Sequence, residues 1–139
     1  MTAYRLDTDD GTLTTVQTVS TVEESEVTPH EGWSCSQIQI CPSGACLFAP
    51  TRGHDTIATF AIDPLTGLLT PSGRVPAPAS PRGVGIAPDG RFLYAAGNQS
   101  ANLWVYSVDE SAGGRLQLVH EYELEGGRSS SWVLPIDLP

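Results

Sequence analysis

The sequence predicts an all-β fold built from a repeated unit, and three observations lead to this prediction. First, the segment 41–48 (CPSGACLF) returns as 87–94 (APDGRFLY), an offset of 46 positions that also holds further along the chain. Second, the apolar runs are short, rich in β-branched and aromatic residues, and separated by Gly, Pro, Asp and Asn. Third, no segment shows a convincing period of 3.6 residues, which an amphipathic helix would require.

The content of each repeat decides between the architectures that such repeats form. Periods of roughly 40–50 residues are typical of solenoids and propellers. In the last repeat we expect four strands, at about 83–87, 92–97, 102–108 and 116–123. Tight turns separate the strands, because 88–90 (PDG) places Pro at the first corner and Gly where a positive φ is needed. Four short antiparallel strands per repeat indicate the blade of a β-propeller.

The chain is expected to begin with a partial blade in residues 1–20. Its segment 4–7 (YRLD) matches 60–63 (FAID), at an offset of 56 rather than 46 positions. The extra positions fall in the Glu-rich stretch 21–34, so we interpret that stretch as a solvated insertion loop between repeats.

Two complete four-stranded blades follow, at 35–75 and 82–124, and a lone closing strand is expected at 131–137. Propellers close with about four to eight blades, so we interpret 1–139 as the C-terminal portion of a single propeller, with partial blades at both ends. Such an array leaves apolar blade faces without neighbours. We therefore expect the isolated chain to self-associate through these faces.

Composition excludes several classes of partner. Among the 139 residues, 16 are acidic and seven are basic, all of them Arg, and the formal net charge is −9. This charge repels nucleic acids and anionic membranes, and the absence of Lys excludes Schiff-base chemistry. No apolar run approaches the ~20 residues of a membrane helix, and the N-terminus does not resemble a secretory signal. Three cysteines are few and odd in number, which fits a reducing compartment and a cytoplasmic location.

No metal or organic cofactor is expected. The cysteines at 35, 41 and 46 lack paired C-x-x-C spacing and a nearby His, so we interpret them as buried strand residues. The sequence holds no phosphate-binding loop, dinucleotide fingerprint or nucleophile elbow. The three tryptophans are interpreted as blade-packing residues: Trp33, Trp104 and Trp132.

At this point the motifs indicate a family. The segment 51–57 (TRGHDTI) resembles the NRGHDSI segment of the seven-bladed lactonase family, which includes bacterial-type 6-phosphogluconolactonase and fungal carboxy-cis,cis-muconate cyclase. One blade later, 80–83 (SPRG) is similar to the family's TPRG segment. The segments 89–94 (DGRFLY), 102–106 (NLWVY) and 132–134 (WVL) also resemble its consensus. The resemblance covers essentially the whole chain and about the C-terminal third of a family member.

The resemblance implies hydrolysis of a sugar lactone such as 6-phosphogluconolactone, with a small anionic lactone or carboxylate as the bound partner. Arg52 matches a proposed catalytic arginine of the family, and its guanidinium would stabilise the charge that develops on the carbonyl oxygen. Arg82 begins an innermost strand and is a candidate for binding the substrate anion. His54 and Gln37 are further candidate substrate-binding residues. For His54, a structural loop histidine held by Asp55 or the backbone is an equally weighted interpretation.

Departures from the family pattern leave open whether this chain is an enzyme. Gln37 stands where the family usually has Asp or Glu, and an amide cannot act as a base. The resemblance places the family's other proposed catalytic residues, a His, an Arg and a Glu, on blades that precede Tyr4. We therefore expect the chain alone to be weakly active or inactive. Two alternatives are a lyase similar to the muconate cyclase and a non-catalytic propeller that acts as an interaction module.

Overall fold

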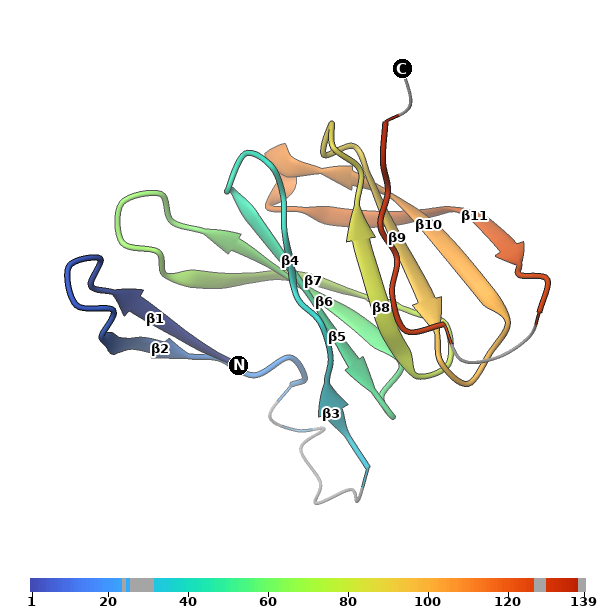
Figure 1. The fold of residues 1–139 in the computed structure, drawn as a ribbon, viewed down its shortest axis with the longest axis horizontal. Coiled ribbons are helices and arrows are strands. Elements are labelled where there is room, and N and C mark those ends of the chain that lie inside the picture. The colour runs from blue at the N-terminus through green and yellow to red at the C-terminus, as the bar shows by residue number, and fades with distance from the viewer. Residues whose placement is uncertain (24, 26–31, 127–129, 138–139) are drawn as a thin grey trace.

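The fold is a series of antiparallel sheets. The structure is a computed structural model that describes residues 1–23, 25, 32–126 and 130–137. Within these ranges the elements are strands β1 to β11 and the 3₁₀ turn η2. The strands form three sheets that follow one another across the molecule (Figure 1). The all-β, partial propeller architecture that the repeat predicts is therefore confirmed.

The first sheet is a hairpin of β1 (Thr2–Leu6) and β2 (Leu13–Thr18). Its turn is closed by two backbone hydrogen bonds: the N–H of Asp7 donates to the carbonyl oxygen of Thr12, and the N–H of Gly11 donates to the carbonyl oxygen of Asp7. Gly11 supplies the positive φ of 77°. The hairpin falls where the partial blade was expected. Most of the insertion loop assigned to the next stretch lies outside the described residues.

The second sheet contains β3 (Ser34–Cys35), β4 (Gln39–Ile40), β5 (Cys46–Arg52), β6 (Thr56–Ile62) and β7 (Leu69–Pro76). The short strands β3 and β4 both pair with β5, so together they form one interrupted edge strand. The remaining strands pair in chain order.

The third sheet contains β8 (Pro81–Ile86), β9 (Phe92–Gly97), β10 (Asn102–Asp109) and β11 (Arg115–Glu123), also paired in chain order. These bounds differ by at most two residues from those predicted. The turn η2 (Glu110–Ala112) connects the last two strands. Among the described residues no helix is both long and apolar enough to cross a membrane.

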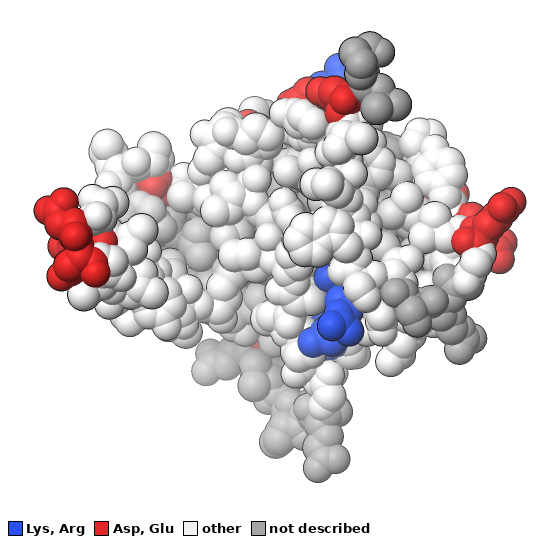
Figure 2. All heavy atoms as spheres, viewed as in Figure 1, with Lys and Arg blue, Asp and Glu red and all other residues white. Residues whose placement is uncertain are grey.

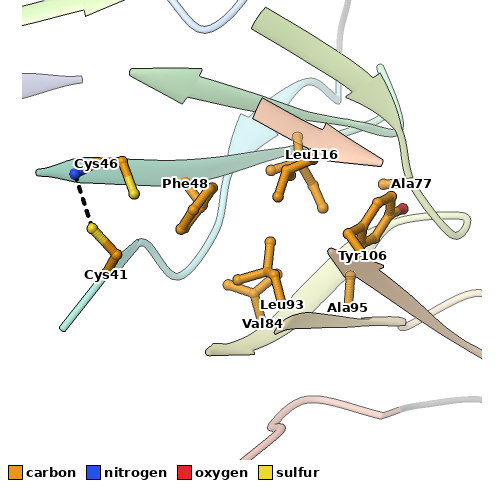
Figure 3. Close-up of a cluster of buried hydrophobic side chains, with 10 residues drawn as sticks. Cys41, Cys46, Phe48, Ala77, Val84, Leu93, Ala95, Tyr106 and Leu116 are labelled. Atoms are coloured by element: carbon orange, nitrogen blue, oxygen red, sulfur yellow. Dashed lines mark hydrogen bonds between the residues drawn. The ribbon is translucent and has the colours of Figure 1, made fainter. Parts of the chain in front are cut away.

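The middle sheet is buried on both faces, because successive side chains of a strand point to opposite sides. On β5, Cys46 and Phe48 face the third sheet, whereas Leu47 and Ala49 face the first. The larger core fills the space between the second and third sheets (Figure 3): Cys41, Cys46, Phe48, Ile57, Ala77, Val84, Leu93, Ala95, Tyr106 and Leu116. The blade faces predicted from the repeat thus pack against each other in sequence order.

Residues 131–137 pair with none of the described strands. The closing strand expected there stays a prediction, because its expected partner strands belong to other blades of the propeller. The segment runs along the face of β8 (Figure 1). A Cβ added to Gly83 would lie 2.9 Å from the backbone nitrogen of Trp132, and one on Gly85 only 2.5 Å from the carbonyl oxygen of Val133. A strand needs a partner edge with free N–H and C=O groups. The segment lies over the face of β8, at Gly83 and Gly85, and not beside the free edge of that strand.

Two packing expectations are corrected by the structure. Cys41 and Cys46 are buried as expected, but Cys35 is exposed, because β3 is a two-residue edge strand with little to cover it. Trp104 packs against the larger core, whereas Trp132 is 67% exposed, since it approaches Gly83 of β8 through its backbone.

Candidate active site

A pocket with a volume of about 290 Å³ opens where the first strands of the two complete blades lie side by side. Its lining residues come from four segments: Ser36 and Gln37 between β3 and β4, Arg52 at the end of β5, Arg82 in β8, and Ser131 and Trp132 near the C-terminus. Ser36 and Arg82 are 46 positions apart in the sequence, which is the repeat offset. The pocket therefore joins equivalent positions of neighbouring blades.

Short contacts fix the walls of the pocket relative to one another. The Ser36 hydroxyl donates a hydrogen bond of 2.6 Å to the carbonyl oxygen of Pro81. On the other side, the missing side chain of Gly83 lets the backbone of Trp132 approach β8. Three successive segments are thereby held together around the arginines.

Arg52 is half-buried and ends β5, where its backbone pairs with Ser34. Its Nε atom is buried and makes no hydrogen bond with any of the described residues. A buried N–H group without a partner has lost its hydrogen bond to water and gained none in return. This loss is unfavourable by about 1–3 kcal/mol. The arrangement is thus suited to donate to an incoming ligand oxygen.

Gln37 presents the complementary atom. Its Oε1 is also buried and, within the part of the chain that the structure describes, accepts no hydrogen bond. The pocket therefore holds one unpaired donor, on Arg52, and one unpaired acceptor, on Gln37. A ligand that carries both an anionic or carbonyl oxygen and a hydroxyl group would satisfy both.

Arg82 supplies an exposed cation at the mouth of the pocket, on the strand β8 whose neighbouring residues Pro81 and Gly83 are buried. Figure 2 shows a basic patch in the middle of the face, acidic side chains at its margins, and a further basic group beside the acidic ones at the top. Among the residues that the structure describes, those that line the pocket include two arginines and no carboxylate. The site is thus locally positive in a chain whose formal net charge is −9.

His54 is not among the residues that line this pocket. Its Nδ1 is 2.9 Å from the Thr56 hydroxyl, and its ring packs edge-on against Trp33 at a centroid distance of 4.8 Å. The contact with the Thr56 hydroxyl is one that the sequence did not suggest. Whether His54 contacts substrate stays a prediction.

Asp55 organises the loop that follows Arg52. One oxygen atom, Oδ1, accepts hydrogen bonds from the backbone N–H of Gly53 at 3.1 Å and of Ser80 at 2.9 Å. Asp55 itself has a φ of 55°, a left-handed conformation that Asp adopts more readily than most residues. It therefore connects the loop after β5 to the chain that enters β8.

Sequence reasoning brought Arg52, Arg82 and Gln37 to one site, and the structure places all three in the pocket. It missed Ser36 and the C-terminal contribution of Ser131. The signal for Ser36 was available, because the repeat offset relates it to Arg82. Nothing in the repeat marks Ser131, since it follows the last complete unit.

Comparison with known proteins supports the fold and places the chain within a longer architecture. The family model described as "Lactonase, 7-bladed beta-propeller" matches residues 1–133. A 6-phosphogluconolactonase of Pectobacterium carotovorum is 31% identical over 130 residues, which cover 94% of this chain and 37% of that protein. The chain thus spans little more than a third of the length of this curated relative.

Two solved structures are similar in fold. The periplasmic gluconolactonase PpgL of Pseudomonas aeruginosa superposes with a TM-score of 0.78 at 23% identity, over 92% of this chain and 35% of that one. A protein from Lactobacillus plantarum superposes with a TM-score of 0.82 at 23% identity, over 94% of this chain and 37% of that one. At these identities the likeness concerns the fold.

Proposed function

Because the chain belongs to the seven-bladed β-propeller lactonase family, we propose that the propeller formed with these blades hydrolyses a sugar lactone, with 6-phosphogluconolactone as the favoured substrate. The observation that carries this proposal is the pocket in which Arg52 and Arg82 converge. Related proteins described as 6-phosphogluconolactonases support the choice of substrate.

In this proposal Arg52 stabilises the reacting carbonyl. Opening of a lactone by water places negative charge on the carbonyl oxygen in the transition state, and a donor fixed in advance at that position lowers the barrier. The buried Nε of Arg52 is such a donor. Removing one comparable donor from an enzyme lowers turnover by about 10²–10³-fold.

Arg82 and Gln37 are proposed to hold the substrate. The exposed guanidinium of Arg82 suits a phosphate or carboxylate group, which a planar fork binds through two parallel hydrogen bonds. The Oε1 of Gln37 suits a sugar hydroxyl, because that atom needs a donor. His54 would act from outside this pocket, where its Nδ1 is engaged with Thr56.

The pocket lacks a group to activate water. None of the lining residues that the structure describes is a carboxylate or a histidine. Gln37 cannot take a proton, so Arg52 and Arg82 bind and stabilise without a base. We therefore propose that residues 1–139 alone bind the ligand and turn it over weakly or not at all. The same observation favours the non-catalytic interaction module as the second candidate.

Ligand binding to the chain 1–139 tests the proposal. Titration calorimetry with 6-phosphogluconate, the stable hydrolysis product, is expected to detect binding, and gluconate is expected to bind more weakly because it lacks the phosphate. Loss of a hydrogen bond to a charged group, about 1.5–3 kcal/mol, predicts a loss of about 10-fold or more for Arg52→Ala. Arg82→Ala should abolish the preference for the phosphorylated ligand.

Arg91→Ala is the matched control, because Arg91 is exposed and paired with Asp89 at 3.1 Å away from the pocket. Equal affinities of the Arg52→Ala, Arg91→Ala and unmodified chains would contradict the assignment of the site. Hydrolysis of 6-phosphogluconolactone by the chain alone, far above the buffer rate, would contradict the proposed lack of a base. If the complete propeller formed a lactone from an open-chain muconate and hydrolysed no sugar lactone, the lyase would be favoured.

We also propose a cytoplasmic location, supported by three cysteines that are free. One structural neighbour is a periplasmic protein, so the compartment needs a direct measurement. Fractionation of cells that produce the protein should recover it with cytoplasmic markers, and recovery in the periplasm would refute the proposal.

A further inference from the structure

A second cluster of reactive side chains lies away from the pocket, at the contact between the second and third sheets. Cys41, Cys46 and Glu110 each offer one ligand atom, and these three atoms lie within 4.8 Å of one another. Cys41 is 2% exposed, Cys46 is fully buried, and Glu110 is half-buried. Figure 3 shows the sulfur atoms of the two cysteines on neighbouring segments, Cys41 after β4 and Cys46 at the start of β5.

Local hydrogen bonds fix the two sulfur atoms. The backbone N–H of Cys46 donates to Sγ of Cys41 at 2.9 Å, and the backbone N–H of Cys41 donates to the carbonyl oxygen of Cys46 at 2.9 Å. The tight turn between them thus holds both side chains in place.

The carboxylate reaches the cluster from the next blade. Glu110 is the first residue of η2, a turn capped by Asp109, whose side chain accepts a hydrogen bond from the backbone of Ala112. A cation held by Glu110 and the two cysteines would therefore connect both complete blades.

Two glycines make room for this approach. A Cβ on Gly114 would lie 2.7 Å from Cβ and 3.1 Å from Sγ of Cys46. A Cβ on Gly90 would lie 3.0 Å from Oε1 of Glu110. Both glycines also have positive φ values, 81° and 75°, so a side chain would be strained there. The backbone is thus shaped to let the donors gather.

The donor set of the cluster suits a thiophilic cation. Two sulfur atoms and one carboxylate oxygen gather at the buried boundary between the blades. Thiolate and carboxylate groups are ligands that Zn²⁺ takes in proteins.

We propose that Cys41, Cys46 and Glu110 form a binding site for a thiophilic divalent cation of the Zn²⁺ class, which clamps the two complete blades together. Zinc binds sulfur at about 2.3 Å and carboxylate oxygen at about 2.0–2.2 Å, so a tetrahedral site places its donors about 3.6–3.8 Å apart. The three ligand atoms lie within 4.8 Å of one another, so the side chains move closer by up to about 1 Å when the ion binds. A water molecule would complete the tetrahedral set. The spacing of the cysteines alone did not predict this site, because its third ligand lies on another blade.

Cobalt and zinc binding to the reduced, metal-free chain 1–139 test the proposal. Titration with Co²⁺ is expected to produce a thiolate-to-metal charge-transfer absorption that saturates at one ion per chain and is displaced by Zn²⁺. The melting temperature should rise with Zn²⁺ concentration, because the ion binds the folded chain. Absence of the charge-transfer absorption in the folded chain overturns the proposal.

Three variants locate the ion. Cys41→Ser is expected to abolish the charge-transfer absorption, and Glu110→Gln, which keeps the shape of the side chain, should weaken binding at least 10-fold. Cys35→Ser is the matched control, because Cys35 is the exposed cysteine and should bind Co²⁺ like the unmodified chain. Unchanged affinity in either of the first two variants, or loss of binding in the control, overturns the assignment.

A measurement without substitutions guards against variants that fail to fold. Zn²⁺ is expected to slow alkylation of Cys41 and Cys46 in the unmodified chain at least 10-fold, while Cys35 reacts at an unchanged rate. Equal effects of Zn²⁺ on all three cysteines would refute the site.

Discussion

Replacement of Asp55 tests how the loop behind the pocket is held. Its Oδ1 atom accepts both the Gly53 and the Ser80 backbone N–H groups, at 3.1 and 2.9 Å. Asp55→Ala removes this acceptor and leaves a residue with a Cβ at a φ of 55°. Asp55→Asn keeps an oxygen at the same position and tolerates the left-handed backbone, so it removes only the charge.

The two variants should differ in stability by a measurable amount. Hydrogen bonds to a charged group contribute about 1.5–3 kcal/mol each, and the low end applies here because Gly53 is exposed. Together with left-handed strain of about 1 kcal/mol, Asp55→Ala is expected to lower the free energy of unfolding by about 3–4 kcal/mol. Asp55→Asn is expected to lower it by about 1 kcal/mol.

Urea unfolding followed by far-ultraviolet circular dichroism measures both variants. With a denaturant dependence of about 2 kcal/mol per molar urea, Asp55→Ala shifts the midpoint by about 1.5–2 M and Asp55→Asn by about 0.5 M. Affinity for 6-phosphogluconate should fall with Asp55→Ala, because the loop after Arg52 loses its tie to β8. Equal midpoints for the two variants would falsify the role of the shared acceptor.

Three further outcomes are expected. The pKa of Asp63 is lowered, first by the hydrogen bond from the Thr66 hydroxyl. The stabilising effect of this carboxylate is therefore present above its unfolded pKa and is lost as the pH falls through its folded pKa, below about pH 4. The urea midpoints of Asp63→Asn and the unmodified chain should converge at that low pH, and a difference that is constant with pH argues against this role. Gly85→Ala is expected to displace the C-terminal segment, since its Cβ would lie 2.5 Å from a carbonyl oxygen, and limited proteolysis should then cleave that segment faster. The chain should self-associate through exposed apolar side chains such as Trp132 and Leu134, which are 67% and 70% exposed. Sedimentation should then show a mass that rises with concentration, and replacing both residues by Ser should weaken this rise. A monomer at all concentrations contradicts the predicted self-association.

Local signals in the sequence were sufficient to predict the blades. Turns such as 88–90 (PDG) depend on Pro and Gly acting on their own backbone, so strands β8 to β11 could be placed within two residues. The arginines of the pocket were found because a motif resembles a family and the repeat offset relates the segments around them.

Contacts between blades were harder to predict, because they depend on side chains that no local pattern relates. The tie of Asp55 to Ser80 joins a loop to the next blade, and Glu110 reaches the cysteines across the same boundary. The C-terminal segment was predicted as a closing strand because 132–134 (WVL) resembles the family's consensus. Such a resemblance does not supply the partner edge that a strand requires.

The hydrogen bond from Ser36 to Pro81 crosses the boundary between blades, and the two arginines stand on opposite sides of that boundary. The separation of the guanidinium groups is therefore governed by the angular pitch from one blade to the next, and not by either blade alone. A ring with more or fewer blades, built from the same repeats, would have a different angle between neighbouring blades. The length of ligand that can contact both Arg52 and Arg82 would change with that angle. Blade number in such a ring is in this sense a determinant of ligand size.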